Sequence, residues 1–209
     1  MHLLLTDRLT CPRCGPEFGL ILLSDRMVDR RVLEGTLGCA NCRDGFPVRE
    51  GFGDLRTPPR GDLPAGRAGE PETDANEGVE RIMALLGVAE GPGTLVLVGG
   101  EARRAAALAE RIPGVEIVGV DADLARWPEI PRVSRMVSRP GLPFFSRSMR
   151  GVVLDGGLGL AWVEEAARVV SPLARVVVTE SKDGTASALE EAGLQILAQE
   201  AGTVVAARS

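Results

Sequence analysis

The stretch from Thr94 to Gly100 constrains the fold more than any other part of the chain. Its sequence is Thr-Leu-Val-Leu-Val-Gly-Gly. A run this short and apolar, ended by glycines, is typical of a strand buried on both faces of a parallel sheet. A helical pattern follows at once, and glycines there let the backbone turn tightly and approach a ligand. We therefore expect the first strand of a doubly wound sheet, with Gly99 and Gly100 beside a ligand.

The rest of the C-terminal part alternates strand-like and helix-like patterns. Helices are predicted at residues 79–86, 101–111, 162–170 and 185–192, and strands at 115–120, 132–137, 151–155, 174–179, 193–198 and 202–207. Alternation of this kind implies right-handed crossovers and a parallel sheet. The predicted fold class is α/β, a doubly wound, mostly parallel sheet with an antiparallel last strand, preceded by a small zinc-ribbon domain.

Composition divides the chain into three parts. Residues 1–56 hold all the cysteines and short strand-like runs at 19–23 and 32–37. Residues 57–78 are rich in proline and glycine and almost free of large apolar side chains, which predicts an exposed linker without a site of its own. Residues 79–209 form the predicted Rossmann-like domain.

Overall composition limits the class of protein. The chain has 209 residues, of which 44% are hydrophobic and 25% charged, which is ordinary for a globular protein with a real core. A net charge of −5 argues against a dedicated nucleic-acid binder. No apolar run approaches the roughly 20 residues of a membrane span, and the first residues lack the pattern of a secretory signal. We expect a cytoplasmic protein without membrane contact.

The four cysteines form two C-x₂-C knuckles, Cys11 with Cys14 and Cys39 with Cys42, separated by 24 residues. This spacing lets both thiolates of each knuckle face one ion and predicts a closed tetrahedral Zn²⁺ site. A redox C-x₂-C or a pair of disulfides are the alternatives, which need a βαβ context or an oxidising compartment. Four protein ligands leave no open position, so the predicted zinc is structural.

The surroundings of the knuckles resemble a known family. The segments are Leu9-Thr-Cys-Pro-Arg-Cys14, Glu34-Gly-Thr-Leu-Gly-Cys-Ala-Asn-Cys42 and Phe46-Pro-Val-Arg-Glu-Gly-Phe-Gly-Asp-Leu55. They are similar to the small zinc-ribbon activator subunit of tRNA and translation-factor methyltransferases, although Phe52-Gly53 stands where the family has Ile-Pro. The resemblance implies a module that docks on a methyltransferase by adding a strand to its sheet, and hence a protein partner for the ribbon.

The C-terminal part resembles class I S-adenosylmethionine-dependent methyltransferases. The matching segments are Leu85-Leu-Gly-Val-Ala-Glu-Gly-Pro-Gly-Thr-Leu-Val-Leu-Val-Gly99, Gly141-Leu-Pro-Phe-Phe-Ser-Arg-Ser-Met-Arg-Gly-Val-Val-Leu154 and Val163-Glu-Glu-Ala-Ala-Arg-Val-Val-Ser-Pro-Leu-Ala-Arg-Val-Val-Val178. The resemblance implies S-adenosylmethionine as cofactor. The chain departs from the family where Leu97 replaces an acid, where Ser138-Arg139 replaces another, and where Glu101 and Arg103 follow the glycines and are expected to crowd the ligand.

The predicted cofactor-binding residues are Gly99, Gly100, Asp121 and Asp155. An acid at the end of the second strand, such as Asp121, binds both ribose hydroxyls of an adenosyl ligand. A helix N-cap is an equally good interpretation of Asp121, because Asp121-Ala-Asp-Leu begins a short helix. Asp155 ends the fourth strand, where methyltransferases place groups that handle the substrate. No residue stands out as a general base.

Six arginines, Arg126, Arg132, Arg135, Arg139, Arg147 and Arg150, lie in a stretch whose one acid is Glu129. A solvated arginine face is the plain interpretation, and a patch for RNA phosphates or another acidic partner is the sharper one. Two functional hypotheses follow from the sequence as a whole. The first is an S-adenosylmethionine-dependent methyltransferase with an unidentified substrate. The second is a catalytically degenerate methyltransferase fold that serves as a scaffold or partner subunit of another enzyme or RNA–protein assembly.

Overall fold

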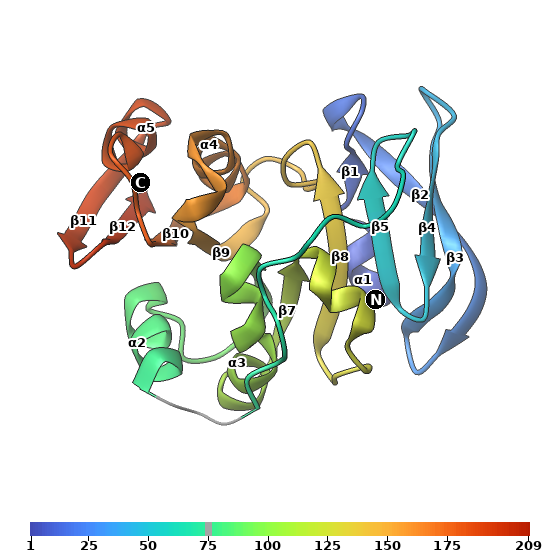
Figure 1. Ribbon diagram of the computed structural model, residues 1–209, viewed down its shortest axis with the longest axis horizontal. Helices are drawn as coiled ribbons and strands as arrows, with labels where there is room; N and C mark the ends of the chain where they lie inside the picture. Colours follow the sequence, from blue (N-terminus) through green and yellow to red (C-terminus); the bar gives the residue numbers. More distant parts are fainter. Residues whose placement is uncertain (74–76) are drawn as a thin grey trace.

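A computed structural model describes residues 1–73 and 77–209, so residues 74–76 of the predicted linker lie outside the described part. One twelve-stranded sheet runs through the described residues in the order β1-β2-β3-β4-β5-β8-β7-β6-β9-β10-β12-β11 (Figure 1). The N-terminal region forms one end of this sheet, and the C-terminal hairpin forms the other.

The N-terminal region is a short helix followed by an antiparallel meander. Its elements are α1 (Leu3–Thr6), β1 (Thr10–Cys11), β2 (Gly15–Val28), β3 (Arg31–Cys39), β4 (Gly45–Arg49) and β5 (Phe52–Arg56). Each strand from β1 to β5 pairs antiparallel with the next. Both strands predicted here are present, and β2 and β3 are longer than the apolar runs that predicted them.

The C-terminal region alternates helices and strands as predicted. Its elements are α2 (Glu77–Leu86), β6 (Gly93–Val98), η1 (Gly99–Arg104), α3 (Ala105–Arg111), β7 (Val115–Val120), η2 (Ala122–Arg126), β8 (Val133–Arg139), β9 (Met149–Asp155), η3 (Gly156–Leu158), α4 (Leu160–Val169), β10 (Val170–Thr179), α5 (Thr185–Glu191), β11 (Leu194–Glu200) and β12 (Thr203–Arg208). Strands β8, β7, β6, β9 and β10 are mutually parallel, and β12 is antiparallel to both β10 and β11. The predicted fold class is confirmed.

The sheet is buried on both faces because side chains alternate along each strand. In β6, Leu95 and Leu97 pack on the face covered by α2 and α3, whereas Val96 and Val98 pack on the face covered by α4 and α5. All four side chains are fully buried. The apolar run at 94–98 is therefore continuous because the strand is buried on both faces, as its pattern indicated.

The stretch between β7 and β9 is reduced, as its prolines suggested. The short 3₁₀ segment η2 is the one helical element described between β7 and β8, and the described residues from Pro140 to Ser148 contain no helix. Strand β8 itself is nevertheless complete, with seven residues. The predicted helix at 101–111 also differs, because its first half is the 3₁₀ segment η1 and α3 begins only at Ala105.

The N-terminal region is joined to the parallel sheet along β5 and β8. These strands pair in parallel, with Phe52 opposite Arg135 and Arg56 opposite Arg139. On the face of α4, side chains such as Phe46 share one buried cluster with Val96. A strand of the N-terminal region thus extends the parallel sheet within this chain.

Candidate functional site

The four cysteines converge on one point at the end of the N-terminal meander. Their sulfur atoms all lie within 4.8 Å of one another. The Sγ atoms of Cys11 and Cys42 are 3.6 Å apart, and those of Cys39 and Cys14 are 3.8 Å apart. Four thiolates at 2.3 Å from a central Zn²⁺ would be separated by about 3.8 Å, so the geometry fits a tetrahedral ion. A disulfide bond is about 2.05 Å long, so none joins these sulfurs.

The surroundings lower the pKa of the Cys39 thiol and raise the pKa values of Cys11 and Cys42. Burial by itself would raise the pKa of the Cys39 thiol, but N–H groups of Cys42 and Asn41 and neighbouring thiols hydrogen-bond to it and lower its pKa to about 7. The side-chain amide of Asn41 also donates to the Cys14 sulfur at 3.3 Å. Donors aimed at sulfur are the support that a metal-bound thiolate needs.

The four predicted cofactor residues meet at the carboxyl ends of neighbouring parallel strands. Gly99 and Gly100 follow β6, Asp121 follows β7, and Asp155 ends β9. The Gly100 N–H donates to Asp155 Oδ2 at 3.2 Å. Gly99 has a φ of +67°, and a Cβ there would lie 3.1 Å from that of Asp155. This position therefore needs glycine for both its backbone conformation and its close neighbour.

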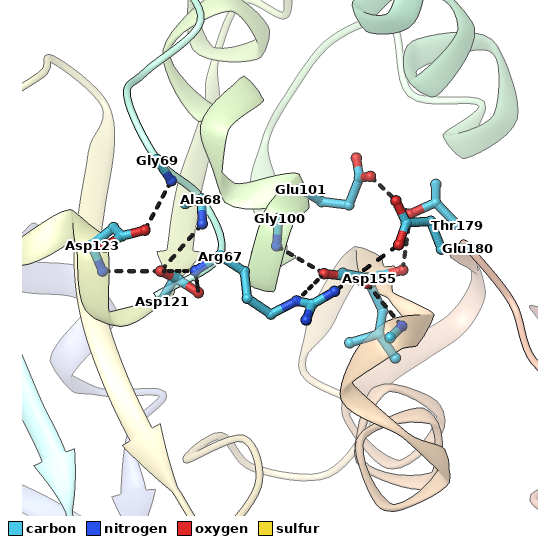
Figure 2. A network of polar contacts seen from close by, with 12 residues as sticks. Arg67, Ala68, Gly69, Gly100, Glu101, Asp121, Asp123, Asp155, Thr179 and Glu180 are labelled. Carbon is cyan, nitrogen blue, oxygen red and sulfur yellow. Dashed lines mark hydrogen bonds and ion pairs between the residues drawn. The ribbon is translucent and has the colours of Figure 1, made fainter. Parts of the chain in front are cut away.

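Asp121 combines the two roles that its sequence left open. It is the N-cap of η2, because its side chain accepts the Asp123 N–H at 2.9 Å. Its carboxylate also accepts the Arg67 N–H, 3.1 Å from each oxygen, and the Ala68 N–H at 3.4 Å (Figure 2). The cap prediction is confirmed, and the same carboxylate also accepts two adjacent backbone N–H groups.

Arg67, which nothing in the sequence singled out, contacts two of the predicted site residues, Asp121 and Asp155. Its guanidinium Nε donates to Asp155 Oδ2 at 2.5 Å, and its Nη2 lies 4.0 Å from Glu180 (Figure 2). Burial would raise the pKa of Asp155, but hydrogen bonds from Arg67 and from the Gly157 and Gly100 N–H groups outweigh it and hold the pKa below its usual value. Residues 67–69 of the predicted linker therefore lie against the carboxyl ends of the parallel strands, where the sequence offers no reason to expect them.

Glu101 and Arg103, which were expected to crowd a ligand, are held by other side chains of the protein. Glu101 is buried and accepts the Thr179 hydroxyl at 2.7 Å, and it pairs with Arg104. Arg103 pairs with Glu72 at 2.8 Å. Both side chains are directed to partners outside the space between Asp121 and Asp155, because the 3₁₀ geometry of η1 aims successive side chains differently from an α-helix.

Two cavities flank this edge. One of about 100 Å³ lies between the linker and the strand ends, with Arg67, Gly99, Asp121 and Trp162 in its wall. A larger one of about 400 Å³ lies between the first cysteine knuckle and α4, and Trp162 lines it as well. Trp162 thus lines both the smaller cavity at the strand ends and the larger groove beside the N-terminal region.

The arginine stretch is not a single face. Arg135 is buried and donates to the carbonyls of Leu124, Trp127 and Glu50. Arg132 donates to the Ile112 carbonyl at 2.9 Å, and Arg150 donates to the carbonyl of Pro92. Guanidinium groups that hold internal carbonyls serve packing, so the prediction of an RNA or acidic partner at this stretch has no support in the structure.

The fold is the predicted doubly wound, mostly parallel sheet, continued at one end by an antiparallel region that holds the four-cysteine cluster. No protein-family model matches the chain, and no curated protein matches it in sequence. None of the described helices has the length and apolar character that crossing a membrane requires.

Among solved structures, the chain is similar to a complex between the Haloferax volcanii Trm112 methyltransferase activator and a protein described as a methyltransferase (19% identity over 58% of this chain and 69% of that one, TM-score 0.48). It is also similar to the 1,6-didemethyltoxoflavin-N1-methyltransferase of Burkholderia thailandensis, solved with S-adenosylhomocysteine (17% identity over 64% of this chain and 77% of that one, TM-score 0.43). A third similar structure is a TehB-like methyltransferase of Corynebacterium glutamicum (13% identity over 63% of this chain and 86% of that one, TM-score 0.46). At such identities the likeness concerns the fold alone.

Proposed function

We propose that the protein is an S-adenosylmethionine-dependent methyltransferase that binds its cofactor at the carboxyl ends of β6 and β7. The observation that carries this proposal is the Asp121 carboxylate, which accepts two adjacent donors at this edge of a doubly wound sheet. Ligands of such sheets bind outside the carboxyl ends of the strands, and an acid after the second strand accepts both ribose hydroxyls.

The neighbouring residues suit the rest of this cofactor. Gly99 and Gly100 lack side chains where a ligand must approach the backbone closely. Asp155 has a pKa below its usual value and stays ionised at neutral pH. A buried carboxylate there attracts a cation, and S-adenosylmethionine carries both an ammonium and a sulfonium group. The guanidinium of Arg67 is the cation that Asp155 holds in this structure.

The methyl acceptor would lie in the groove of about 400 Å³ beside Trp162. This volume is within the range of small-molecule sites. Proline and tryptophan side chains form much of its wall, and Trp162 also borders the cofactor edge. An acceptor in this groove would therefore be next to the cofactor.

We further propose that the cysteine cluster binds one structural Zn²⁺. The sulfur separations fit a tetrahedral ion, and four thiolates close its coordination. The ion would fix both knuckles, and through β5 it would stabilise the edge of the sheet to which β8 belongs.

Calorimetric titration with S-adenosylmethionine tests the cofactor assignment. We expect binding to the wild-type protein, and a loss of about ten- to a hundredfold in affinity in Asp121→Asn, which removes a charged acceptor. The control is Asp25→Asn, which changes an exposed carboxylate of β2. If the folded protein does not bind S-adenosylmethionine at millimolar concentration even when the site is accessible, the proposal fails. The alternative function, an inactive scaffold or partner subunit, then becomes the better one.

A further inference from the structure

Residues 64–69, called the strap below, stand in the proposed cofactor site. The strap crosses the carboxyl ends of β7 and β9, and its Arg67 contacts both Asp121 and Asp155 (Figure 2). Further along, the Gly69 N–H donates to Asp123 at 2.9 Å. The strap thus contacts Asp121 and Asp155, the two carboxylates that the proposed function assigns to the cofactor, and also Asp123 beside them.

The fit between strap and site is too close to leave room for a ligand. A Cβ on Gly66 would lie 2.3 Å from Asp121 Oδ1 and 2.3 Å from Asp123 Cγ, so the backbone is in direct contact with both acids. The space that remains is about 100 Å³. Sites for ligands of drug-like size need roughly 300 Å³ or more, so strap and cofactor exclude each other.

The contacts of the strap reproduce the chemistry of the cofactor. Two neighbouring N–H groups, of Arg67 and Ala68, donate to Asp121 as vicinal hydroxyls would. A delocalised cation, the Arg67 guanidinium, pairs with Asp155 as an ammonium or sulfonium would. One peptide segment therefore satisfies both carboxylates that the proposed function assigns to the ligand.

The chain is fastened on both sides of the strap. On the side of the ribbon, the Arg56 guanidinium donates to the Asp62 carbonyl at 2.7 Å and Arg13, within the first knuckle, donates to the Pro58 carbonyl at 2.8 Å. On the other side, Trp127 Nε1 donates to the Gly69 carbonyl at 2.8 Å and the Glu72 N–H to the Arg103 carbonyl at 2.8 Å. These anchors can hold while the middle leaves the site.

Glycines lie among the anchored positions on both sides of the strap's middle. Gly61 and Gly69 have φ values of +61° and +62°, and nothing lies within 4 Å of a Cβ built on either. Such positions absorb a change in backbone direction at low cost. The Arg67 side chain between them is 44% exposed, so its ion pair with Asp155 is open to water and can exchange.

We infer that the strap is an autoinhibitory segment: it competes with S-adenosylmethionine for Asp121 and Asp155, and Arg67 is the latch that keeps the site closed. This inference rests on the proposed function, because competition requires a ligand for the same site. The apparent affinity for cofactor is then the intrinsic affinity multiplied by the fraction of molecules in which the strap is displaced.

Two variants release the strap by different means. Arg67→Ala removes the latch, and Gly66→Ala keeps Arg67 but places a methyl group against Asp121 and Asp123. Gly66 has no left-handed backbone, so alanine costs it no strain there. The matched control is Arg111→Ala. Arg111 lies on α3, its side chain is 50% exposed, and it forms an ion pair with Glu80 of α2.

Each protein is titrated with S-adenosylmethionine, and hydrogen exchange of the Arg67 and Ala68 amides is followed in the same samples. We expect both variants to bind about three- to tenfold more tightly than the wild type, with faster exchange of these two amides, and Arg111→Ala to behave as the wild type. Continued protection of the β6 amides shows that the variants are folded.

The outcomes separate the two claims. Equal affinity in wild type and variants, with cofactor bound while the strap amides stay protected, overturns the strap as a competitor and leaves the cofactor site standing. Faster exchange in the folded variants without binding at millimolar cofactor overturns the proposed function and, with it, the competition.

Discussion

The cysteine cluster and the cofactor edge are assembled in different ways. The cluster takes all its ligands from two knuckles whose internal spacing already places the sulfurs on one point. The cofactor edge takes its acids from strand ends, but the residue that occupies it, Arg67, is 54 positions from Asp121 and 88 from Asp155. A local motif specifies its own geometry, whereas a site between strand ends can be filled by any segment that the fold brings there.

Breaking the cluster should have the largest effect. Cys39→Ser removes one of four ligands, and we expect it to cost more than about 3 kcal/mol of unfolding free energy and most of the bound zinc. The loss of stability should extend from the N-terminal region to the parallel sheet, because Cys39 belongs to the same buried cluster as Val96 of β6. Urea unfolding together with metal analysis measures both quantities.

The control for this experiment is Asn41→Ala, which removes one side-chain donor to Cys14 and should cost less than about 1 kcal/mol. Freshly reduced wild-type protein without zinc, and as stable as Cys39→Ser, would contradict the assignment of the cluster.

Removing the acceptor at the cofactor edge should have an intermediate effect. Asp121→Ala leaves the N–H groups of Arg67, Ala68 and Asp123 without their acceptor and removes a helix cap, which together should cost about 2 kcal/mol. Urea unfolding measures the cost, and hydrogen exchange should show the strap amides released. The control is the exposed Asp25, whose replacement by alanine should change stability by less than about 0.5 kcal/mol. Strap amides that stay protected in Asp121→Ala would show that other contacts hold the segment.

The sequence predicted those features that depend on local pattern. The strand at 115–120 and the helix that ends at Leu86 follow from apolar periodicity, and their bounds agree with the structure within two residues. The parallel direction of most strands followed from the alternation of strands and helices, and the antiparallel last strand from the C-terminal hairpin. The same reasoning placed Gly99, Gly100, Asp121 and Asp155 at one edge, because the carboxyl ends of parallel strands coincide.

The occupant of that edge could not be predicted. Proline and glycine between 57 and 73 are typical of exposed linkers, and nothing in the letters around Arg67 distinguishes a latch from a solvated arginine. Its role depends on where β7 and β9 end, which only the tertiary fold decides. Gly66 is a partial signal in retrospect, since the absence of a side chain permits contact with Asp121 and Asp123. A single glycine in a glycine-rich segment is nevertheless uninformative.

The Arg67–Asp155 pair should make a small contribution to stability that depends on pH. The folded protein holds the pKa of Asp155 below its ordinary value, so the contribution is complete above the ordinary carboxyl pKa of about 3.9 and is lost as the pH falls through the lower, folded value. Solvent screens the exposed guanidinium, so Arg67→Ala should cost less than about 1 kcal/mol at pH 7. The urea midpoints of wild type and variant, measured at pH 7, at pH 5, at pH 4 and below pH 4, should converge only at the lowest pH values. A difference that grows with acidity would contradict the ion pair.

The smallest expected effect is that of replacing Glu101. This experiment tests whether the strap or the glycine loop closes the proposed cofactor site. Glu101 lies directly after the glycine pair, but its carboxylate accepts the Thr179 hydroxyl and pairs with Arg104, and no contact joins it to Asp121 or Asp155. Glu101→Gln should therefore change the affinity for S-adenosylmethionine by less than about twofold, whereas Gly66→Ala increases it. If Glu101→Gln opened the site as much as Gly66→Ala does, the obstruction would come from the glycine loop, and a local motif would control this edge as it controls the cysteine cluster.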